Sequence, residues 1–135
     1  MVALIVLICY LVVRLSIELS APERDGRRIV TALRVLTVAT RLEPGCLSCG
    51  IWTELGEDSY LHYEERWRSE EAIRRRVLSD AFTKLLEVLE ASPTRPTVAF
   101  DFVARRRGLE FIEEVRGLGP SCESRAEETG PVSHK

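Results

Sequence analysis

Two cysteines three residues apart are the first candidates for chemistry in this sequence. Cys46 and Cys49 lie in the stretch EPGCLSCGIW, residues 43–52, and a Cys-x-x-Cys spacing can bind a metal or form a redox disulfide. A redox motif normally opens a helix, whereas this one follows a helical pattern and enters a strand, where residues three apart point to opposite faces. A zinc site would need two further ligands, and the candidates lie near the chain ends: Cys9, Cys122 and His134. We therefore interpret the two cysteines as small apolar fillers in the turn that starts a strand.

The charge and cysteine content of the 135-residue chain exclude several classes of protein. The formal net charge is −2, whereas a dedicated nucleic-acid binder is usually basic, so we expect no nucleic-acid partner. The arginine runs at 74–76 and 105–107 stand among acidic residues and indicate solvated faces. The four cysteines are too few for a secreted disulfide scaffold, which favours a reducing cytoplasm as the location.

The two ends of the chain differ in composition from its middle. Residues 1–13 are apolar, but as a helix they would span about 20 Å, short of the ~30 Å core of a bilayer. We expect an extension of the first strand or an upstream start codon there, with a membrane tether as the less favoured alternative. Residues from about 119 are polar and predict a disordered tail. The predicted organisation is an extension at 1–9, a domain at 10–118 and a tail at 119–135.

Periodicity along the chain predicts the elements that must position any site. Residues 14–20 alternate as a half-buried strand, 21–26 form a turn, and apolar positions from Ile29 to Thr40 recur at helical spacing. Two strands follow at 46–54 and 59–67, joined by a short turn as a hairpin. Ser69 should cap the next helix, which Ser79 and Asp80 could cap again and so divide into two segments. A fourth strand at 97–103 and a short amphipathic helix at 109–115 complete the pattern.

The order of these elements, β-α-β-β-α-β, predicts an α+β, ferredoxin-like domain. Both helices should cover one face of a four-stranded antiparallel sheet. The second face should also carry apolar groups. Tyr60, Ala99 and Val103 point to it, whereas the other large apolar residues of the same two strands point to the first face. We expect a second copy of the chain to cover that face in a homodimer.

Three stretches of the chain carry motifs in a recognisable order and spacing. TRLEPGCLSC at 40–49 has the form T-R-x-E-P-G-C-L-x-Y/C, YEERWRSEEA at 63–72 contains E-x-W-x-S-x-x-A, and SDAF at 79–82 has the form S-x-x-F. Together they lie within about residues 10–104 and resemble the antibiotic biosynthesis monooxygenase (ABM) domain family. The resemblance implies a ferredoxin-like fold that assembles as a dimeric α/β-barrel.

The resemblance also implies a class of chemistry. Members of that family include oxygenases that bind a phenolic or quinol-type aromatic between sheet and helices and help to deprotonate it. The resulting anion reacts with dioxygen directly, without a metal or flavin. We therefore expect a cofactor-independent monooxygenase acting on a small aromatic molecule of quinol or polyketide type. The alternative is a non-catalytic ABM-fold dimer that binds a small aromatic or acidic ligand.

The same resemblance suggests the residues that would carry this chemistry. Glu65 matches a glutamate on the family's third strand, and His62 is the one histidine of the predicted folded region. Arg76 stands nine residues after Trp67, where many catalytic relatives carry a histidine. Arginine stays protonated, so it would stabilise a phenolate or bind an acidic ligand and would not act as an ordinary general base. The candidate substrate contacts are aromatic: Trp52, Tyr63, Trp67 and Phe82.

Alternative structural roles remain open for each of these residues. Strand alternation puts Tyr63 and Glu65 on one face and His62 on the other, so His62 and Glu65 should not both point inward. Glu65 could instead tie strand to helix by hydrogen bonds, and His62 could simply be exposed. Arg76 could be a solvent-facing member of its arginine run.

Overall fold

The computed structural model describes residues 11–54 and 57–117, and it divides into two compact units, the first ending at Ala104 and the second beginning at Arg105. The first unit contains strands β1 (Val12–Ser20), β2 (Cys46–Glu54), β3 (Glu57–Trp67) and β4 (Thr97–Val103). It also contains helices α2 (Glu23–Thr40), α3 (Glu70–Val77) and α4 (Asp80–Glu90). The second unit contains helix α5 (Leu109–Arg116). The predicted extension at 1–9 and tail at 119–135 lie outside the described residues, so the predicted domain boundaries stay a prediction.

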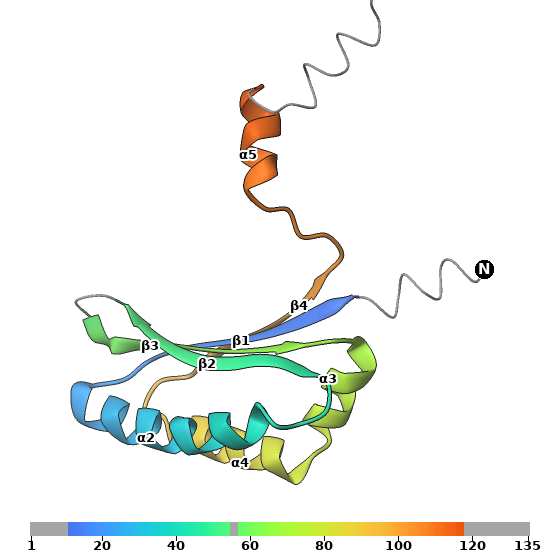
Figure 1. Cartoon of the computed structure of the whole chain (residues 1–135). Helices are drawn as coiled ribbons and strands as arrows, with labels where there is room; N and C mark the ends of the chain where they lie inside the picture. The colour runs from blue at the N-terminus through green and yellow to red at the C-terminus, as the bar shows by residue number, and fades with distance from the viewer. Residues whose placement is uncertain (1–10, 55–56, 118–135) are drawn as a thin grey trace, which may run out of the picture. The chain divides into compact units, whose positions relative to one another are not determined.

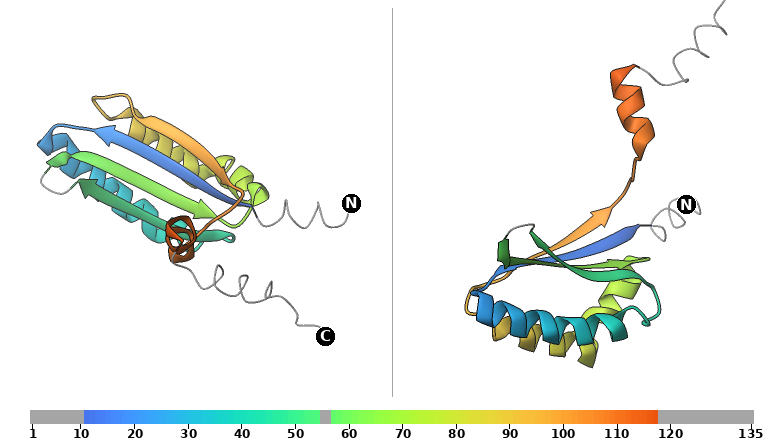
Figure 2. Two further views of the ribbon diagram at one scale, coloured as in Figure 1. Left: turned by 90° about the horizontal axis from the view of Figure 1, so that it is seen from above. Right: turned by 60° about the vertical axis from the view of Figure 1, so that its left-hand side comes forward.

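The first unit is the predicted ferredoxin-like α+β fold. The four strands form one antiparallel sheet in the order β2-β3-β1-β4 (Figure 2), and the helices of this unit lie on one face of it (Figure 1). This face is called the inner face below, and the opposite face the outer face. Within the described residues, no helix is long and apolar enough to cross a membrane.

The core lies between the inner face and the helices. Alternate residues of β1 point into it and are almost completely buried, whereas their neighbours are not. The helices contribute apolar side chains at three- and four-residue spacing, as their amphipathic pattern predicts. The main core cluster consists of Leu15, Ile17, Leu19, Ala21, Ile29, Leu33, Cys49, Leu61, Tyr63, Phe82, Leu85 and Leu89.

The break between α3 and α4 falls where the sequence predicts it. The hydroxyl of Ser69 accepts a hydrogen bond from the backbone N–H of Ala72 at 3.2 Å, which caps α3. Ser79 caps α4 in the same way by accepting from the N–H of Phe82 at 3.2 Å. The second cap therefore ends one helix and starts the next, which changes the direction of the chain beside the sheet.

Helix α2 begins earlier than the sequence pattern indicates. Residues 21–26 were expected to form a turn, but the helix starts at Glu23. The backbone N–H of Gly26 donates to the carbonyl of Pro22 at 2.8 Å. Proline suits this boundary because its φ of −55° is already close to the helical value and its own missing N–H needs no partner.

The outer face carries the apolar residues that the sequence places there, Tyr60, Ala99 and Val103, and it also carries charged groups along its two central strands. Arg14 of β1 lies opposite Arg66 of β3, and Glu18 lies opposite His62. Glu64 of β3 lies between these two cross-strand pairs and adds a further charge. A partner for this face would therefore meet charged groups as well as the few apolar ones.

The second unit is described by itself. Helix α5 is followed by Gly117, whose φ of +69° gives the left-handed C-cap that glycine adopts readily. All four of its large apolar side chains are about half exposed or more: Leu109, Phe111, Ile112 and Val115.

Candidate functional site

Glu65 and Arg76 form a buried ion pair at the centre of the inner face. Glu65 is completely buried and Arg76 is only 2% exposed. One guanidinium nitrogen, Nη2, lies 2.7 Å from Glu65 Oε1, and Nε lies 3.2 Å from both carboxylate oxygens. Arg76 is therefore not the solvent-facing residue that the alternative interpretation described. A pair buried this deeply needs further hydrogen bonds to offset the loss of hydration of both charges.

The further partners of the Glu65 carboxylate come from its own strand. The Tyr63 hydroxyl donates to Oε1 at 2.5 Å, and the Trp67 indole N–H donates to Oε2 at 2.8 Å. Since residues two apart on a strand share a face, β3 alone brings these three side chains together. The Cys49 thiol in turn donates to the Tyr63 hydroxyl oxygen at 3.3 Å. Each oxygen of the Glu65 carboxylate thus accepts from one residue of β3 and from Arg76.

The remaining donors of Arg76 bind the end of α2 and the turn that follows it. Nη2 donates to the Thr40 hydroxyl and Nη1 to a Glu43 carboxylate oxygen, each at 3.1 Å. The guanidinium also lies 6.0 Å from the Trp67 ring centroid and 5.5 Å from that of Phe82, which adds cation–π attraction. This arrangement resembles a structural tie between separate elements more than an open reaction site.

The protonation states of the buried groups follow from this geometry. Burial would lower the pKa of Arg76, but its hydrogen bonds to Glu65 and the Glu65 charge outweigh burial and raise it. Burial and the neighbouring Glu65 carboxylate raise the pKa of Tyr63. Burial also raises the pKa of Cys49 to about 11, despite the hydrogen bond with Tyr63. At neutral pH the tyrosine and the thiol are therefore neutral donors around one carboxylate.

The structure places two of the predicted site residues on the other side of the sheet. Trp52 and His62 are neighbours across β2 and β3 on the outer face, with ring centroids 5.9 Å apart. The Trp52 ring covers Gly50, and its side chain is 53% exposed. The prediction that Trp52 lines one cavity with Tyr63, Trp67 and Phe82 is therefore wrong, because strand parity sends it to the opposite face.

His62 has carboxylate neighbours of its own on the outer face. Its Nε2 lies 3.2 Å from Glu64 and its Nδ1 lies 3.7 Å from Glu18. The sheet separates it from Glu65 and Arg76, as the strand alternation predicts. His62 and the buried pair cannot act on one substrate within a single copy of the chain.

A β-bulge corrects the expected divergence of the two cysteines. The strand register shifts between Cys46 and Ser48, so that Cys46 lies opposite Trp67 and Cys49 opposite Glu65. Trp67 and Glu65 share the inner face, and both thiols therefore lie on that face too. Among the residues that the structure describes, no group of three or more metal-ligating side chains could hold a metal ion.

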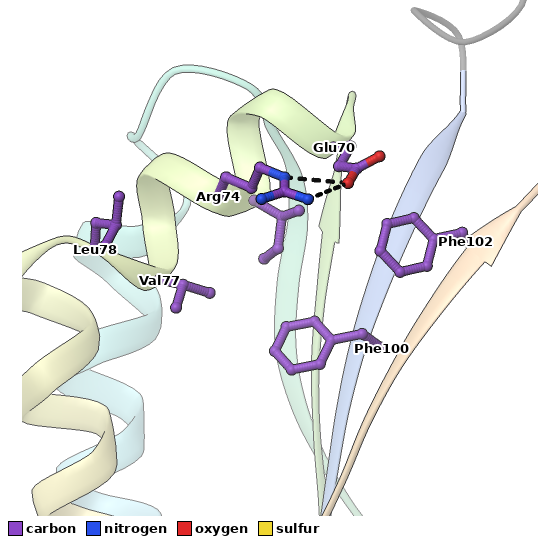
Figure 3. Close-up of a pocket in the computed structure, with 7 residues that line it drawn as sticks. Glu70, Arg74, Val77, Leu78, Phe100 and Phe102 are labelled. Atoms are coloured by element: carbon purple, nitrogen blue, oxygen red, sulfur yellow. Dashed lines mark hydrogen bonds and ion pairs between the residues drawn. The ribbon is translucent and has the colours of Figure 1, made fainter.

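An open groove with two phenylalanines in its wall lies between α3 and β4. Its volume is about 360 Å³, which falls in the usual range for ligand sites. The rings of Phe100 and Phe102 project from β4 toward α3 (Figure 3), and they are 40% and 51% exposed. Glu70 and Arg74 lie on the α3 side and are hydrogen-bonded to each other at 2.8 and 3.1 Å (Figure 3). The complete lining is Glu70, Ile73, Arg74, Val77, Leu78, Phe100 and Phe102.

Sequence reasoning did not single out the residues of this groove. A usable signal was present, because Val98, Phe100 and Phe102 alternate on one face of β4. In the observed strand order, β4 is an edge strand. The helices of this unit leave the inner-face side chains of β4 about half exposed.

Comparisons with known proteins agree with the fold. A candidate antibiotic biosynthesis monooxygenase from Deinococcus radiodurans is 19% identical with a TM-score of 0.66, over 72% of this chain and 97% of that one. A conserved protein from Methanosarcina mazei Go1 is 20% identical with a TM-score of 0.62, over 70% and 94% of the two chains. An antibiotic biosynthesis monooxygenase of known structure is 18% identical with a TM-score of 0.59, over 67% and 97%. No curated protein matches the sequence.

The family assignment rests on a broader match. The model of the family described as antibiotic biosynthesis monooxygenase matches residues 12–88. This range begins with β1 and extends into α4, and it includes all three motifs that suggested the family. The chain therefore belongs to the antibiotic biosynthesis monooxygenase (ABM) family.

Proposed function

We propose that this chain is a cofactor-independent monooxygenase that takes a small phenolic or quinol-type aromatic into the groove between α3 and β4. The observation that carries the proposal is the combination of two half-exposed phenylalanines with one carboxylate–guanidinium pair in the same groove. Aromatic walls bind a planar ring, and a few polar groups fix its orientation. Membership of the ABM family supports oxygenase chemistry over other uses of such a groove.

The groove offers a role for each of its polar residues. The Glu70 carboxylate would accept the proton of a bound phenol, and the Arg74 guanidinium would stabilise the phenolate. The electron-rich ring then donates electrons to dioxygen and bonds to it, so that a hydroquinone and dioxygen give a hydroxyquinone and water. The quinol supplies all the electrons for this reaction. One oxygen atom enters the ring and the other leaves as water.

A non-catalytic binding protein is the second candidate, and one observation favours it. Arg76 occupies the position where the family resemblance implies a catalytic histidine, and its donors are already hydrogen-bonded to Glu65, Thr40 and Glu43. The Glu65–Arg76 pair does not line the groove. In this candidate the groove binds an aromatic or acidic ligand near Arg74 without changing it.

Oxygen uptake and binding, measured together, separate the two candidates. Purified protein would be mixed with a panel of hydroquinones while dissolved oxygen and ligand binding are followed. The monooxygenase predicts uptake above the rate without protein, which Arg74→Gln should reduce about tenfold or more and Arg75→Gln should not. Binding without uptake identifies the second candidate. An absence of binding across the panel would refute both.

We also infer that two copies of the chain associate through the outer face. The family resemblance suggests such a dimer. The charges on the outer face suggest that the strands of the two copies run in opposite directions. Arg14 and Arg66 lie side by side toward one end of the central strands, whereas Glu18 lies toward the other end. Arg14 is paired with Asp101 at 3.1 Å and Arg66 Nε lies 3.9 Å from Glu64, but neither Nε has a hydrogen-bond acceptor in the described structure. A second copy running in the opposite direction would bring acidic groups over these arginines.

A further inference from the structure

A second hollow follows the groove along β4. Its volume is about 460 Å³, and Val98 of β4 forms part of its wall. Helix α4 contributes Leu86 and Leu89 to the opposite side, and the segment between α4 and β4 closes the far end. The full lining is Leu86, Leu89, Glu90, Ser92, Pro93, Thr94, Arg95, Pro96 and Val98.

The two hollows lie end to end along one strand. Phe102, Phe100 and Val98 alternate along β4 on the inner face, since they lie opposite the buried residues of β1. The first two line the groove and the third lines the second hollow. A strand advances about 3.3 Å per residue, so Val98 and Phe102 are about 13 Å apart along it. The two hollows together therefore extend along β4, and they are called the channel below.

Large apolar side chains remain exposed on both walls of this channel. On β4, Val98 is 47% exposed and Phe100 and Phe102 are similarly exposed. On the helices, Val77 of α3 and Leu86 of α4 are 41% and 43% exposed. Exposed apolar surface of this kind often marks a binding site.

The polar groups of the channel stand at its two ends. Glu70 and Arg74 belong to the groove end, and Glu90 and Arg95 belong to the far end. Between them, Val77, Phe100 and Val98 present only hydrocarbon to a ligand. A small flat ring at Arg74 would occupy the groove end alone and leave the rest of the apolar surface in water.

We propose that the natural ligand is an amphiphile, with a phenolic head beside Glu70 and Arg74 and an alkyl tail that extends along β4 to Val98. This inference rests on the proposed function of the groove and adds the class of ligand. The head receives the polar pair, and the tail covers the exposed apolar side chains of β4 and α4. Each methylene that leaves water contributes to affinity, so tail length should determine how tightly the ligand binds.

A matched pair of esters tests the tail directly. Methyl and octyl 4-hydroxybenzoate share one head group and would be titrated by calorimetry at concentrations where both are monomeric. We expect the octyl ester to bind about tenfold tighter or more, because the longer tail buries additional methylenes. Val98→Asp should remove this advantage and leave the Kd of the methyl ester unchanged. Val35→Asp on α2 is the control, since Val35 is 70% exposed and lines neither hollow.

Leu86→Asp on α4 provides a second variant on the other wall, in case a charge on β4 impairs folding. This variant should also weaken the binding of the octyl ester and leave that of the methyl ester unchanged. If the unmodified chain binds the two esters with equal affinity, the proposed binding of an alkyl tail is refuted, whereas the proposed function of the groove stands. Failure of both esters to bind would count against the proposed function itself. A change of oligomeric state in Val98→Asp, measured by sedimentation, would show that a second copy occupies the channel and would also overturn the proposal.

Discussion

Arg76 connects four segments of the fold through a single guanidinium. It binds Thr40 at the end of α2, Glu43 in the following turn and Glu65 on β3, and it stacks against Phe82 of α4. A side chain with this many partners is held in one conformation, so it contributes more to structure than to turnover. Its identity still matters, because only arginine carries enough donors in a planar array to reach all of these partners.

Replacing Arg76 with methionine should strongly destabilise the fold. The variant leaves the Glu65 carboxylate buried without its cation, and breaking a buried pair in this way costs about 3–5 kcal/mol of unfolding free energy. Urea denaturation would measure the loss. Arg75→Met is the control, because Arg75 is exposed on the same helix and should change stability by about 0.5 kcal/mol or less. Equal midpoints for the two variants would mean that the pair is not buried.

The two cysteines should differ in reactivity despite sharing a face. Cys46 is half-buried and Cys49 is buried, and burial raises the pKa of both thiols, that of Cys49 to about 11. The thiolate is the nucleophile, so Cys49 should resist maleimide at pH 8 and react faster as the pH approaches 11. A chain with Cys9→Ser and Cys122→Ser removes the other thiols. Rapid labelling of Cys49 in the folded chain at pH 8 would contradict this expectation.

The same shift predicts a loss of stability at alkaline pH. A thiol in an unfolded chain has a pKa of about 8.5, below the folded value of about 11 for Cys49. Its contribution to stability is therefore complete below about pH 8.5 and is lost as the pH rises through 11. Between these limits, the unfolding free energy of Cys49→Ala should depend less steeply on pH than that of the unmodified chain.

At the scale of elements, the connection from α2 to β2 depends on one glycine. Gly45 has a φ of +88°, and an added Cβ would lie 2.7 Å from the Cβ of Ala72. Its carbonyl also accepts a hydrogen bond from the N–H of Arg68 at 2.8 Å, which joins this turn to the end of β3. Both the backbone conformation and the close approach of α3 therefore require glycine.

Gly45→Ala should destabilise the first unit by more than backbone strain alone. The left-handed conformation costs about 1–2 kcal/mol for an alanine, and the contact with Ala72 adds to this. Gly117→Ala is a matched control, since Gly117 also has a positive φ but has nothing within 4 Å of its added Cβ. Thermal unfolding should show a lower Tm for the first variant. Similar Tm values for the two variants would rule out the contact with Ala72 as a cause of the destabilisation.

Hydrophobic periodicity predicted the helices and strands of the first unit. Local irregularities explain the details that it missed. The caps at Ser69 and Ser79 are short-range features, so the split between α3 and α4 could be read from the sequence. The β-bulge after Cys46 could not be read from the sequence. One extra residue in a strand reverses the face to which the side chains before it point. The groove also escaped prediction, because the exposure of Phe100 depends on how far the helices extend over an edge strand.

At the scale of the whole molecule, the charged outer face gives the proposed dimer a testable direction. In a symmetric dimer whose strands run in opposite directions, the arginine end of one copy meets the Glu18 end of the other. In the parallel arrangement, Arg66 would instead face Arg66 of the second copy. The first arrangement is attractive and weakens with added salt, whereas the second is repulsive and strengthens with salt.

Two charge reversals distinguish these arrangements. Arg66→Glu alone places a carboxylate beside Arg14 at the end that meets Glu18 of the other copy, and Glu18→Arg alone places a cation at the end that meets the arginines. Each should dimerise about tenfold more weakly in the opposite-direction arrangement, since symmetry repeats the unfavourable contact and each exposed pair contributes up to about 1 kcal/mol. An equimolar mixture of the two variants should recover the original affinity as a heterodimer, measured by sedimentation. If Arg66→Glu alone dimerises as well as the unmodified chain, the copies do not run in opposite directions, and if the unmodified chain is monomeric, the dimer itself is refuted.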